Sequence, residues 1–292
     1  MTMTKQSFSN WAVFILLAIV WGSSFILMKI CSEHLTGWQI ASIRIFSAGL
    51  IFLPFAVFHV AKIPLPKLPL VIVSGMLGNL FPAFLFAVAI ERKFNSSLAG
   101  ILNSLTPLFV IVIGVLFFKS KVENKKIAGV LVGFAGLLIL NFSKGTIAIN
   151  DLGSTVLILI ATMMYGLNVN MVSKYLKEVD AIKIATVSMA FVGIPAGIIM
   201  WQQNVFELLQ YDETARSSIA IAALLGIGGS AIATALFYIL IQKAGGLFAS
   251  LVTYAIPVVA IFWGLIANED VTAIQIGCLM LILVGVYLAN RK

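Results

Sequence analysis

Polar and aromatic side chains recur inside long apolar stretches of this sequence, at spacings that suit the binding of a small molecule. Trp21 and Ser24 are three residues apart, and so are Tyr165 and Asn168, so each pair shares one face of a helix. Amide and hydroxyl groups can replace the lost hydration of a solute, and aromatic faces can pack on its apolar or cationic part. The residues predicted to bind a solute are Trp21, Ser24, Arg44, Asn79, Asn103, Tyr165, Asn168, Tyr238 and Tyr254.

The alternative for each of these residues is a structural role, because polar side chains also join membrane helices by hydrogen bonds. Arg44 is the clearest ionisable residue within an apolar stretch, and such residues are functional candidates. Its alternative role is to pair with backbone carbonyls or helix ends, and both interpretations stay open. Lys29 lies near the end of its stretch and is expected to extend to the membrane surface. Glu91 and Arg92 are expected to be solvated.

Residues that could catalyse a reaction are missing from these stretches. No Asp or Glu lies in the middle of any of them, and His34 and His59 lie in or next to connections. A hydrolase or metalloenzyme would need clustered His, Asp or Glu side chains. Cys31 and Cys278 suggest neither a disulfide framework nor a metal site. We therefore predict no catalytic residue, no metal site and no cofactor, and no carboxylate relay for protons.

The composition is that of an integral membrane protein. Of the 292 residues, 61% are hydrophobic and 10% are charged, and the mean hydropathy is +1.09. Soluble domains carry about 25% charged residues. The net charge of +8 comes from cations in short segments between apolar stretches, so it does not indicate nucleic-acid binding.

The apolar stretches have the length of membrane-spanning helices, which need about 20 residues. They are too long for the alternating strands of about 10 residues that build membrane barrels. The sequence therefore predicts an all-α integral membrane protein with ten transmembrane helices. The expected spans are residues 11–30, 37–58, 68–90, 96–118, 127–142, 152–172, 184–201, 218–241, 246–267 and 271–289.

The basic residues predict how the chain is oriented in the membrane, because cytoplasmic connections carry an excess of Lys and Arg. With a cytoplasmic N-terminus, five cations lie at the outer surface: Lys29, Arg92, Lys93, Lys144 and Arg216. Thirteen lie at the inner surface: Lys5, Lys62, Lys67, Lys119, Lys121, Lys125, Lys126, Lys174, Lys177, Lys183, Lys243, Arg291 and Lys292. Both termini are therefore predicted to be cytoplasmic.

The two halves of the chain resemble each other. Trp21-Gly22-Ser23-Ser24-Phe25 matches Tyr165-Gly166-Leu167-Asn168-Val169 at a shift of 144 residues, and Gly49 matches Gly193 at the same shift. Pro107 matches Pro257 at a shift of 150 residues, as Gly78 matches Gly228. Five helices per half is an odd number, so the second half must be inverted relative to the first. We predict two inverted five-helix repeats, residues 1–144 and 145–292.

Pro107 and Pro257 are predicted to be hinges. Each lies near the middle of its span, where a proline removes a backbone donor and clashes with the preceding turn. Bends are therefore expected in the fourth and ninth spans.

Several motifs resemble those of the drug/metabolite transporter superfamily, EamA type. Trp21-Gly22-Ser23-Ser24-Phe25 followed by Lys29 resembles the family's "WGxxF…K" opening, and Arg44 matches its arginine in the second helix. Glu269-Asp270-Val271-Thr272, with Gln275 and Gly277, matches its "GExLTxxQxxG" signature. The first-half copy departs from this signature at Lys121-Val122-Glu123-Asn124, and Ser188 stands where a second Arg44 would be, so the halves need not be equivalent in function.

The resemblance implies a central cavity and a transporter of a small polar or amphipathic metabolite, amino-acid-like, that works by alternating access and exports its solute across a bacterial-type cytoplasmic membrane. The expected partners are this solute and the lipid bilayer. No nucleic acid is expected, and nothing in the sequence indicates an oligomer. Two other classes of function remain: a membrane-embedded enzyme, and a structural or lipid-interacting membrane protein that transports nothing.

Overall fold

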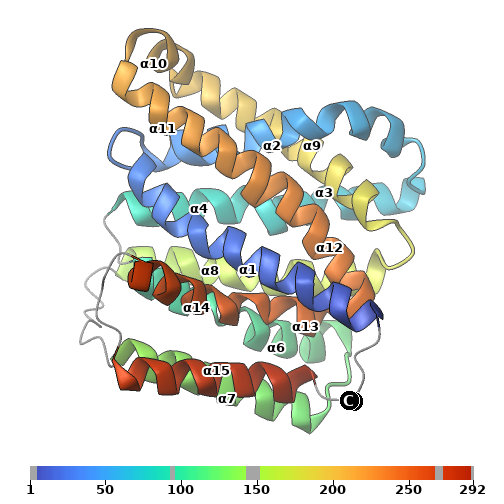
Figure 1. Ribbon diagram of the computed structural model, residues 1–292. Helices are drawn as coiled ribbons and strands as arrows, with labels where there is room; N and C mark the ends of the chain where they lie inside the picture. Colours follow the sequence, from blue (N-terminus) through green and yellow to red (C-terminus); the bar gives the residue numbers. More distant parts are fainter. Residues whose placement is uncertain (1–4, 93–95, 143–151, 267–271, 291–292) are drawn as a thin grey trace.

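The computed structural model describes residues 5–92, 96–142, 152–266 and 272–290. Every regular element in these ranges is a helix, and the long helices run side by side (Figure 1). In the part of the chain described, six helical segments are long and apolar enough to cross a membrane: Phe8–Cys31, Gly37–Val60, Leu65–Glu91, Leu152–Tyr175, Ala181–Gln202 and Glu213–Ala244. Shorter apolar helices cover Thr106–Phe118, Gly246–Val259 and Ile276–Ala289.

The first half of the chain follows the predicted spans closely. Its elements are α1 (Lys5–Cys31), α2 (Gly37–Val60), η1 (Leu65–Lys67), α3 (Leu68–Gly75), η2 (Met76–Leu80), α4 (Phe81–Glu91), α5 (Ser96–Asn103), α6 (Thr106–Phe118) and α7 (Asn124–Phe142). The third predicted span is thus α3, η2 and α4 in succession, and the fourth is α5 and α6.

The rest of the chain has a similar succession of helices, with one addition. Its elements are α8 (Leu152–Tyr175), α9 (Ala181–Gln202), α10 (Val205–Tyr211), α11 (Glu213–Leu224), η3 (Leu225–Ile232), α12 (Ala233–Ala244), α13 (Gly246–Ser250), α14 (Val252–Ile266) and α15 (Ala273–Asn290). The eighth predicted span consists of α11, η3 and α12, and the ninth of α13 and α14. The short helix α10 lies in what the sequence suggested was a connection.

Local hydrogen bonds explain where several helices begin. The Thr36 hydroxyl accepts from the Gln39 amide, and the Gln39 side chain accepts from the Thr36 amide, which forms a capping box on α2. Glu91 was expected to be solvated only, but its carboxylate also accepts from the Gly37 amide at 2.8 Å. Since helix N-termini attract negative charge, Glu91 stabilises α2 from the end of α4.

Asp212 begins α11 in the same manner at the exposed end of the bundle. Its carboxylate accepts from the backbone amides of Thr214 and Ala215 at 2.9 and 3.0 Å. Hydrogen bonds from the Thr214 side chain and the Ala215 amide hold the pKa of the Asp212 carboxyl below its usual range. Because the ionised form is the bonded one, this cap is fully present at neutral pH and is lost only as the pH falls through that lowered pKa.

Both predicted hinge prolines lie in spans that are interrupted, but at different places. The fourth span breaks between Asn103 and Thr106, and Pro107 lies in the first turn of α6, where a missing donor costs little. The ninth span breaks at Leu251, and Pro257 lies inside α14. The two breaks touch, since the Ser104 hydroxyl donates to the Thr253 carbonyl at 3.2 Å.

Two π-helical segments occupy matched positions in the halves. η2 lies in the third span and contains Gly78, and η3 lies in the eighth and contains Gly228. A π turn has wider i→i+5 hydrogen bonding than an α-helix, and such turns are frequent at functional sites. The sequence did not predict these segments.

Glycines let two pairs of helices approach until their backbones touch. A Cβ atom on Gly49 of α2 would lie 2.7 Å from the Gly193 Cα of α9. A Cβ atom on Gly285 of α15 would lie 2.7 Å from the Gly129 carbonyl oxygen of α7 and would overlap the Gly133 backbone. Figure 1 shows α7 and α15 paired along one edge of the molecule. Small residues permit such approaches in membrane proteins.

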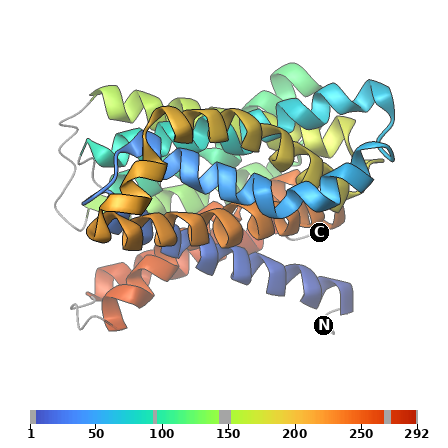
Figure 2. The same cartoon turned by 90° about the horizontal axis from the view of Figure 1, so that it is seen from above.

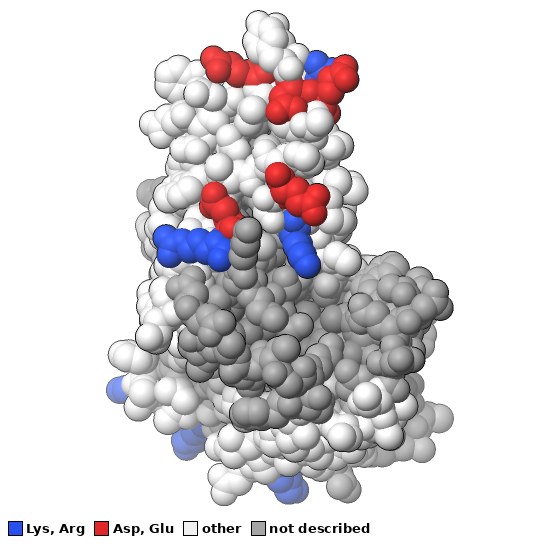
Figure 3. Space-filling model, turned by 90° about the vertical axis from the view of Figure 1, so that its left-hand side faces the viewer, with Lys and Arg blue, Asp and Glu red and all other residues white. Residues whose placement is uncertain are grey.

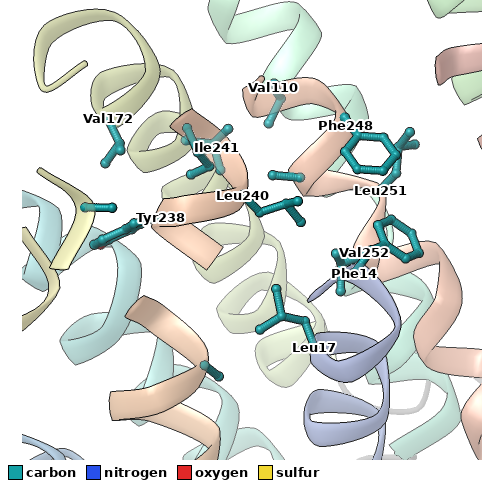
Figure 4. Close-up of a cluster of buried hydrophobic side chains, with 14 of the residues drawn as sticks. Phe14, Leu17, Val110, Val172, Tyr238, Leu240, Ile241, Phe248, Leu251 and Val252 are labelled. Carbon is teal, nitrogen blue, oxygen red and sulfur yellow. The ribbon is translucent and has the colours of Figure 1, made fainter. Parts of the chain in front are cut away.

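A large apolar cluster fills the bundle toward the end where α1 begins and α8 and α12 finish (Figure 4). The rings of Trp11, Phe14 and Phe248 pack on one another with centroids 5.2 to 5.3 Å apart. Leu17 and Leu251 beside them are fully buried. This cluster joins helices of both halves on one side of the cavity described next.

Candidate functional site

A cavity of about 90 Å³ lies among helices of both halves of the chain. It is lined by eight of the nine residues predicted to bind a solute: Trp21, Ser24, Arg44, Asn79, Asn103, Tyr165, Asn168 and Tyr238. Further lining residues that were not among the nine include Phe25, Met28, Phe86, Thr106, Gly229, Ser230, Thr234, Phe237 and Thr253. No Asp or Glu is among the described residues that line it.

The two π-helical segments and the broken spans position much of this lining. Asn79 belongs to η2, and Gly229 and Ser230 belong to η3. Asn103 is the last residue of α5, immediately before the break in the fourth span, where the Thr106 hydroxyl donates to its carbonyl at 2.6 Å. The irregular backbone therefore lies beside the cavity, where it positions polar side chains, and inside the protein rather than against lipid.

Arg44 enters the cavity from α2, and no acidic residue among those described pairs with it. Its Nε donates to the Ser230 hydroxyl at 2.7 Å, and its Nη1 lies 3.8 Å from the Met28 sulfur. Tyr165 is close enough to interact with it electrostatically. Among the described residues the single ion pair is that of Lys126 with Glu123, outside the cavity. Neither contact is to a backbone carbonyl, but the hydrogen bond to Ser230 joins α2 to η3, as a structural role would require.

A hydrogen-bonded group around Tyr238 forms part of the cavity wall. The Tyr238 hydroxyl lies 2.8 Å from the Ser74 hydroxyl, and the Asn168 amide donates to it at 3.3 Å. Nearby, the Thr234 hydroxyl donates to the Asn79 carbonyl oxygen at 2.8 Å. These bonds join the third, sixth and eighth spans and hold the two asparagines in place.

Three buried amide atoms at the cavity have no hydrogen-bond partner within the described ranges: Nδ2 of Asn79, Oδ1 of Asn103 and Oδ1 of Asn168. These side chains are 8%, 6% and 2% exposed. Rotating the Asn79 or Asn168 amide by 180° exchanges its nitrogen and oxygen, but one polar atom still lacks a partner. Each such group costs about 1–3 kcal/mol when it stays unsatisfied.

Aromatic rings form the rest of the wall. The Trp21 indole donates to the Gly229 carbonyl at 3.0 Å and packs edge-on against Phe237. Tyr165 stacks on Phe86 with ring centroids 6.2 Å apart. Such faces can hold the apolar part of a solute, beside amides that can hold its polar part.

Two polar residues within the spans have structural contacts and do not line the cavity. Tyr254 was predicted to bind a solute, but it is not among the cavity lining, and its hydroxyl donates to the Val130 carbonyl of α7 at 2.9 Å. Asn170, one turn beyond Gly166, donates to the Val110 and Gly166 carbonyls, both at 2.9 Å. Both side chains join helices, which is the structural role considered for this class of residue.

A family model of the EamA-like transporter family matches the chain twice, over residues 10–142 and 153–291. An uncharacterized transporter of Archaeoglobus fulgidus is 24% identical, covering 97% of this chain and 99% of the relative. The uncharacterized inner membrane transporter YedA of Escherichia coli K12 is 25% identical, covering 94% and 91%. A probable amino-acid metabolite efflux pump of Salmonella typhimurium is 29% identical over 131 residues, covering 43% and 40%.

The fold is also that of a solved crystal structure, with a TM-score of 0.68 at 16% identity, covering 97% of this chain and 96% of the other. The cavity, the apolar helices and the two family matches over nearly the whole sequence agree with one another. The chain is a multi-pass membrane protein and belongs to the EamA-like transporter family.

Proposed function

We propose that the protein moves a small polar or amphipathic metabolite, amino-acid-like, through the central cavity and out of the cell by alternating access. The observation that carries this proposal is the set of three unpartnered amide atoms at one cavity. A solute that satisfied all three would offset a cost of about 1–3 kcal/mol for each of them. The name of the Salmonella relative supports an amino-acid metabolite and export.

We also propose that ten helices cross the membrane, as two inverted halves of residues 1–144 and 145–292. The two separate family matches and the paired π segments support a duplication. The contact between Gly49 and Gly193 supports a two-fold relation, because equivalent residues touch each other only near a symmetry axis. Such inverted repeats are typical of transporters whose site lies at the repeat interface.

Alternating access needs a cavity that is closed at one end at a time. The apolar cluster around Phe14, Leu17 and Phe248 packs helices of both halves together at the end of the bundle where α1 begins (Figure 4). Separating the halves there, and closing them at the other end, would expose the same cavity to the opposite side. The breaks in the fourth and ninth spans are suitable places for such movement.

For the orientation, we propose cytoplasmic termini in a bacterial inner membrane. α1 begins and α15 ends at one end of the bundle (Figure 2). The opposite end, where α2 and α11 begin, shows several acidic side chains (Figure 3). The exposed acids of this end are Glu33, Glu91, Glu207 and Glu213. The connections at the end with the termini carry most of the lysines, which favours the cytoplasm for that end.

We predict that a green fluorescent protein fused after Lys292 will fluoresce, and that alkaline phosphatase at the same place will be inactive, because the first folds in the cytoplasm and the second in the periplasm. Active phosphatase with a dark fluorescent fusion would contradict the proposed orientation.

Transport itself is tested in proteoliposomes loaded with a mixture of L-amino acids. We expect the wild type to release a subset of them, and Asn103→Ala and Tyr165→Ala each to lower this flux at least about tenfold, since one lost hydrogen bond to a bound solute can cost about 1.5 kcal/mol. Asn124→Ala is the control, because Asn124 is exposed at the start of α7. Flux of no amino acid in the wild type, or equal flux in all four proteins, would refute the proposal.

An imposed pH gradient extends this experiment. Because no acidic residue lines the cavity in the described ranges, we expect flux to follow the solute gradient alone. The competing mechanism is proton exchange through Glu91, or through Glu269, which lies outside the described residues. Uptake against a solute gradient that requires the pH gradient and disappears in Glu91→Gln or Glu269→Gln would overturn this expectation.

A further inference from the structure

We propose that Arg44 and Ser230 form a subsite for a carboxylate group, so that the protein accepts organic acids and rejects the matching compounds whose carboxylate is replaced by a neutral amide. This inference rests on the proposed function and adds to it the charge that a solute must carry. It is argued from the contacts of Arg44 and from the chemistry of the cavity wall.

The guanidinium group of Arg44 is a charge without a countercharge. It has five N–H donors and stays protonated in proteins. Its contacts within the described residues are a neutral hydroxyl and a thioether, on Ser230 and Met28, and Nη2 has no acceptor there. Arg44 is half-buried, so its charge is partly withdrawn from water, and an opposite charge beside it would offset that loss. A carboxylate, with two oxygens that match the guanidinium fork, is the group that satisfies it best.

The backbone around Arg44 holds this donor group in a fixed place. Gly226 of η3 packs so closely on α2 that a Cβ atom there would overlap the Arg44 carbonyl oxygen and the Ser47 hydroxyl. The Ser47 hydroxyl in turn lies 3.3 Å from the Ala223 carbonyl and 2.8 Å from the Ile43 carbonyl. η3 therefore lies directly on α2 and presents Ser230 to the Arg44 Nε. A donor that is already oriented loses less entropy when its ligand binds.

The other unpartnered groups suit the rest of such a solute. Asn79, Asn103 and Asn168 each leave one buried amide atom without a partner in the described residues. For Asn79 and Asn168, the orientation of the amide decides whether that atom is the oxygen or the N–H group. Amide oxygens accept from an ammonium or N–H group, and the amide nitrogen can donate to a second oxygen of the solute. A molecule with a carboxylate and a separate hydrogen-bond donor, as in a zwitterionic α-amino acid, uses every one of these groups.

A structural role for Arg44 makes a different prediction. If the side chain only joined α2 to η3, then its loss would weaken the binding of all solutes alike, whatever their charge. If it holds a carboxylate, then its loss must act on the acid and spare the amide. The ratio between the two compounds therefore separates the roles, and it does not depend on how much protein folds.

The test compares L-amino acids with the corresponding L-amino-acid amides, which differ only in the carboxylate. Flux is measured in proteoliposomes, and binding is measured by calorimetry on purified protein, for the wild type, Arg44→Gln, Arg44→Lys and Ser230→Ala. Arg216→Gln is the matched control, because Arg216 donates to the Leu209 and Gln210 carbonyls outside the cavity.

We expect the wild type and Arg216→Gln to prefer acids over amides at least about tenfold, and Arg44→Gln to remove this preference, since the charged hydrogen bonds to the carboxylate are lost. Arg44→Lys should keep part of the preference, and Ser230→Ala should lower it less than Arg44→Gln. Equal affinity of the wild type for acids and amides, or an Arg44→Gln variant that keeps the preference, would overturn the inference. A wild type that binds acids but moves no solute would refute the proposed transport and leave the carboxylate subsite supported.

Discussion

Replacing Gly285 with valine is expected to prevent the protein from reaching a stable fold. Gly285 of α15 faces α7, and a Cβ atom there would overlap the Gly133 backbone and lie 2.7 Å from the Gly129 carbonyl oxygen. Backbone atoms cannot rotate away as a side chain can, so the two helices would have to separate along their length. Overpacking a core commonly destabilises a protein by about 1–3 kcal/mol. We expect a clash between two helix backbones to cost at least the upper end of that range.

The same helix supplies the control for this prediction. Gly277 also lies in α15, but no atom of the described residues comes within 4 Å of a Cβ atom placed on it. Gly277→Val should therefore give monodisperse protein in detergent, with a thermal midpoint close to that of the wild type, whereas Gly285→Val should give aggregate or no protein. Normal yield and thermal stability of Gly285→Val would show that α7 and α15 are not packed as closely as the structure has them.

Gly78→Ala is expected to lower transport at least about tenfold while the protein still folds. Gly78 lies in η2, and a Cβ atom on it would overlap the Asn168 amide nitrogen and lie 3.1 Å from the Tyr238 hydroxyl oxygen. The obstacle here is a side chain, which can move, so the cost to the fold should be moderate. Asn168 would be displaced from its bond to Tyr238, and a loss of about 1.4 kcal/mol in solute binding corresponds to a factor of ten.

Gly228→Ala provides the matched comparison, because Gly228 of η3 is matched to Gly78 in the proposed repeat, and no atom of the described residues lies within 4 Å of a Cβ atom there. Both variants add one methyl group to a π-helical segment, so any general effect on helix geometry is shared. Flux and solute affinity are measured side by side, with thermal unfolding as the check on folding. Equal effects of the two substitutions on solute affinity would contradict the role given to Asn168.

Much of the cavity could be predicted from the sequence for a simple physical reason. A polar side chain in an apolar span avoids lipid, so it must face either the cavity or a neighbouring helix. Shared helix faces then bring Trp21 to Ser24 and Tyr165 to Asn168, and all four line the cavity. Sequence spacing could not decide whether Tyr254 faces the cavity or a neighbouring helix. In the structure its hydroxyl donates to the Val130 carbonyl of α7.

Two of the lining residues missed by sequence reasoning, Gly229 and Ser230, lie in backbone that departs from the α-helix. Ser230 contacts Arg44 from η3. A π turn contains more residues than an α turn, so the ideal 3.6-residue repeat predicts the wrong side of the helix for residues after it. The sequence signal available was the glycine-rich run from Gly226 to Ser230, which marks close packing and irregular geometry but not its direction. Glu91 was missed as a helix cap because its partner, Gly37, is distant in sequence.

The unpaired charge of Arg44 makes the empty cavity sensitive to voltage. A cation that is exposed first to one side of the membrane and then to the other crosses part of the electric field, and a full crossing is worth about 2.3 kcal/mol per 100 mV. Bacterial membranes are negative inside, so this field favours the orientation in which the Arg44 charge faces the cytoplasm, whichever way the chain is inserted. A zwitterionic solute adds no net charge, so the loaded site carries the same charge outward. The potential then shifts the balance between the two orientations of the site but supplies no net driving force, which agrees with flux that follows the solute gradient alone.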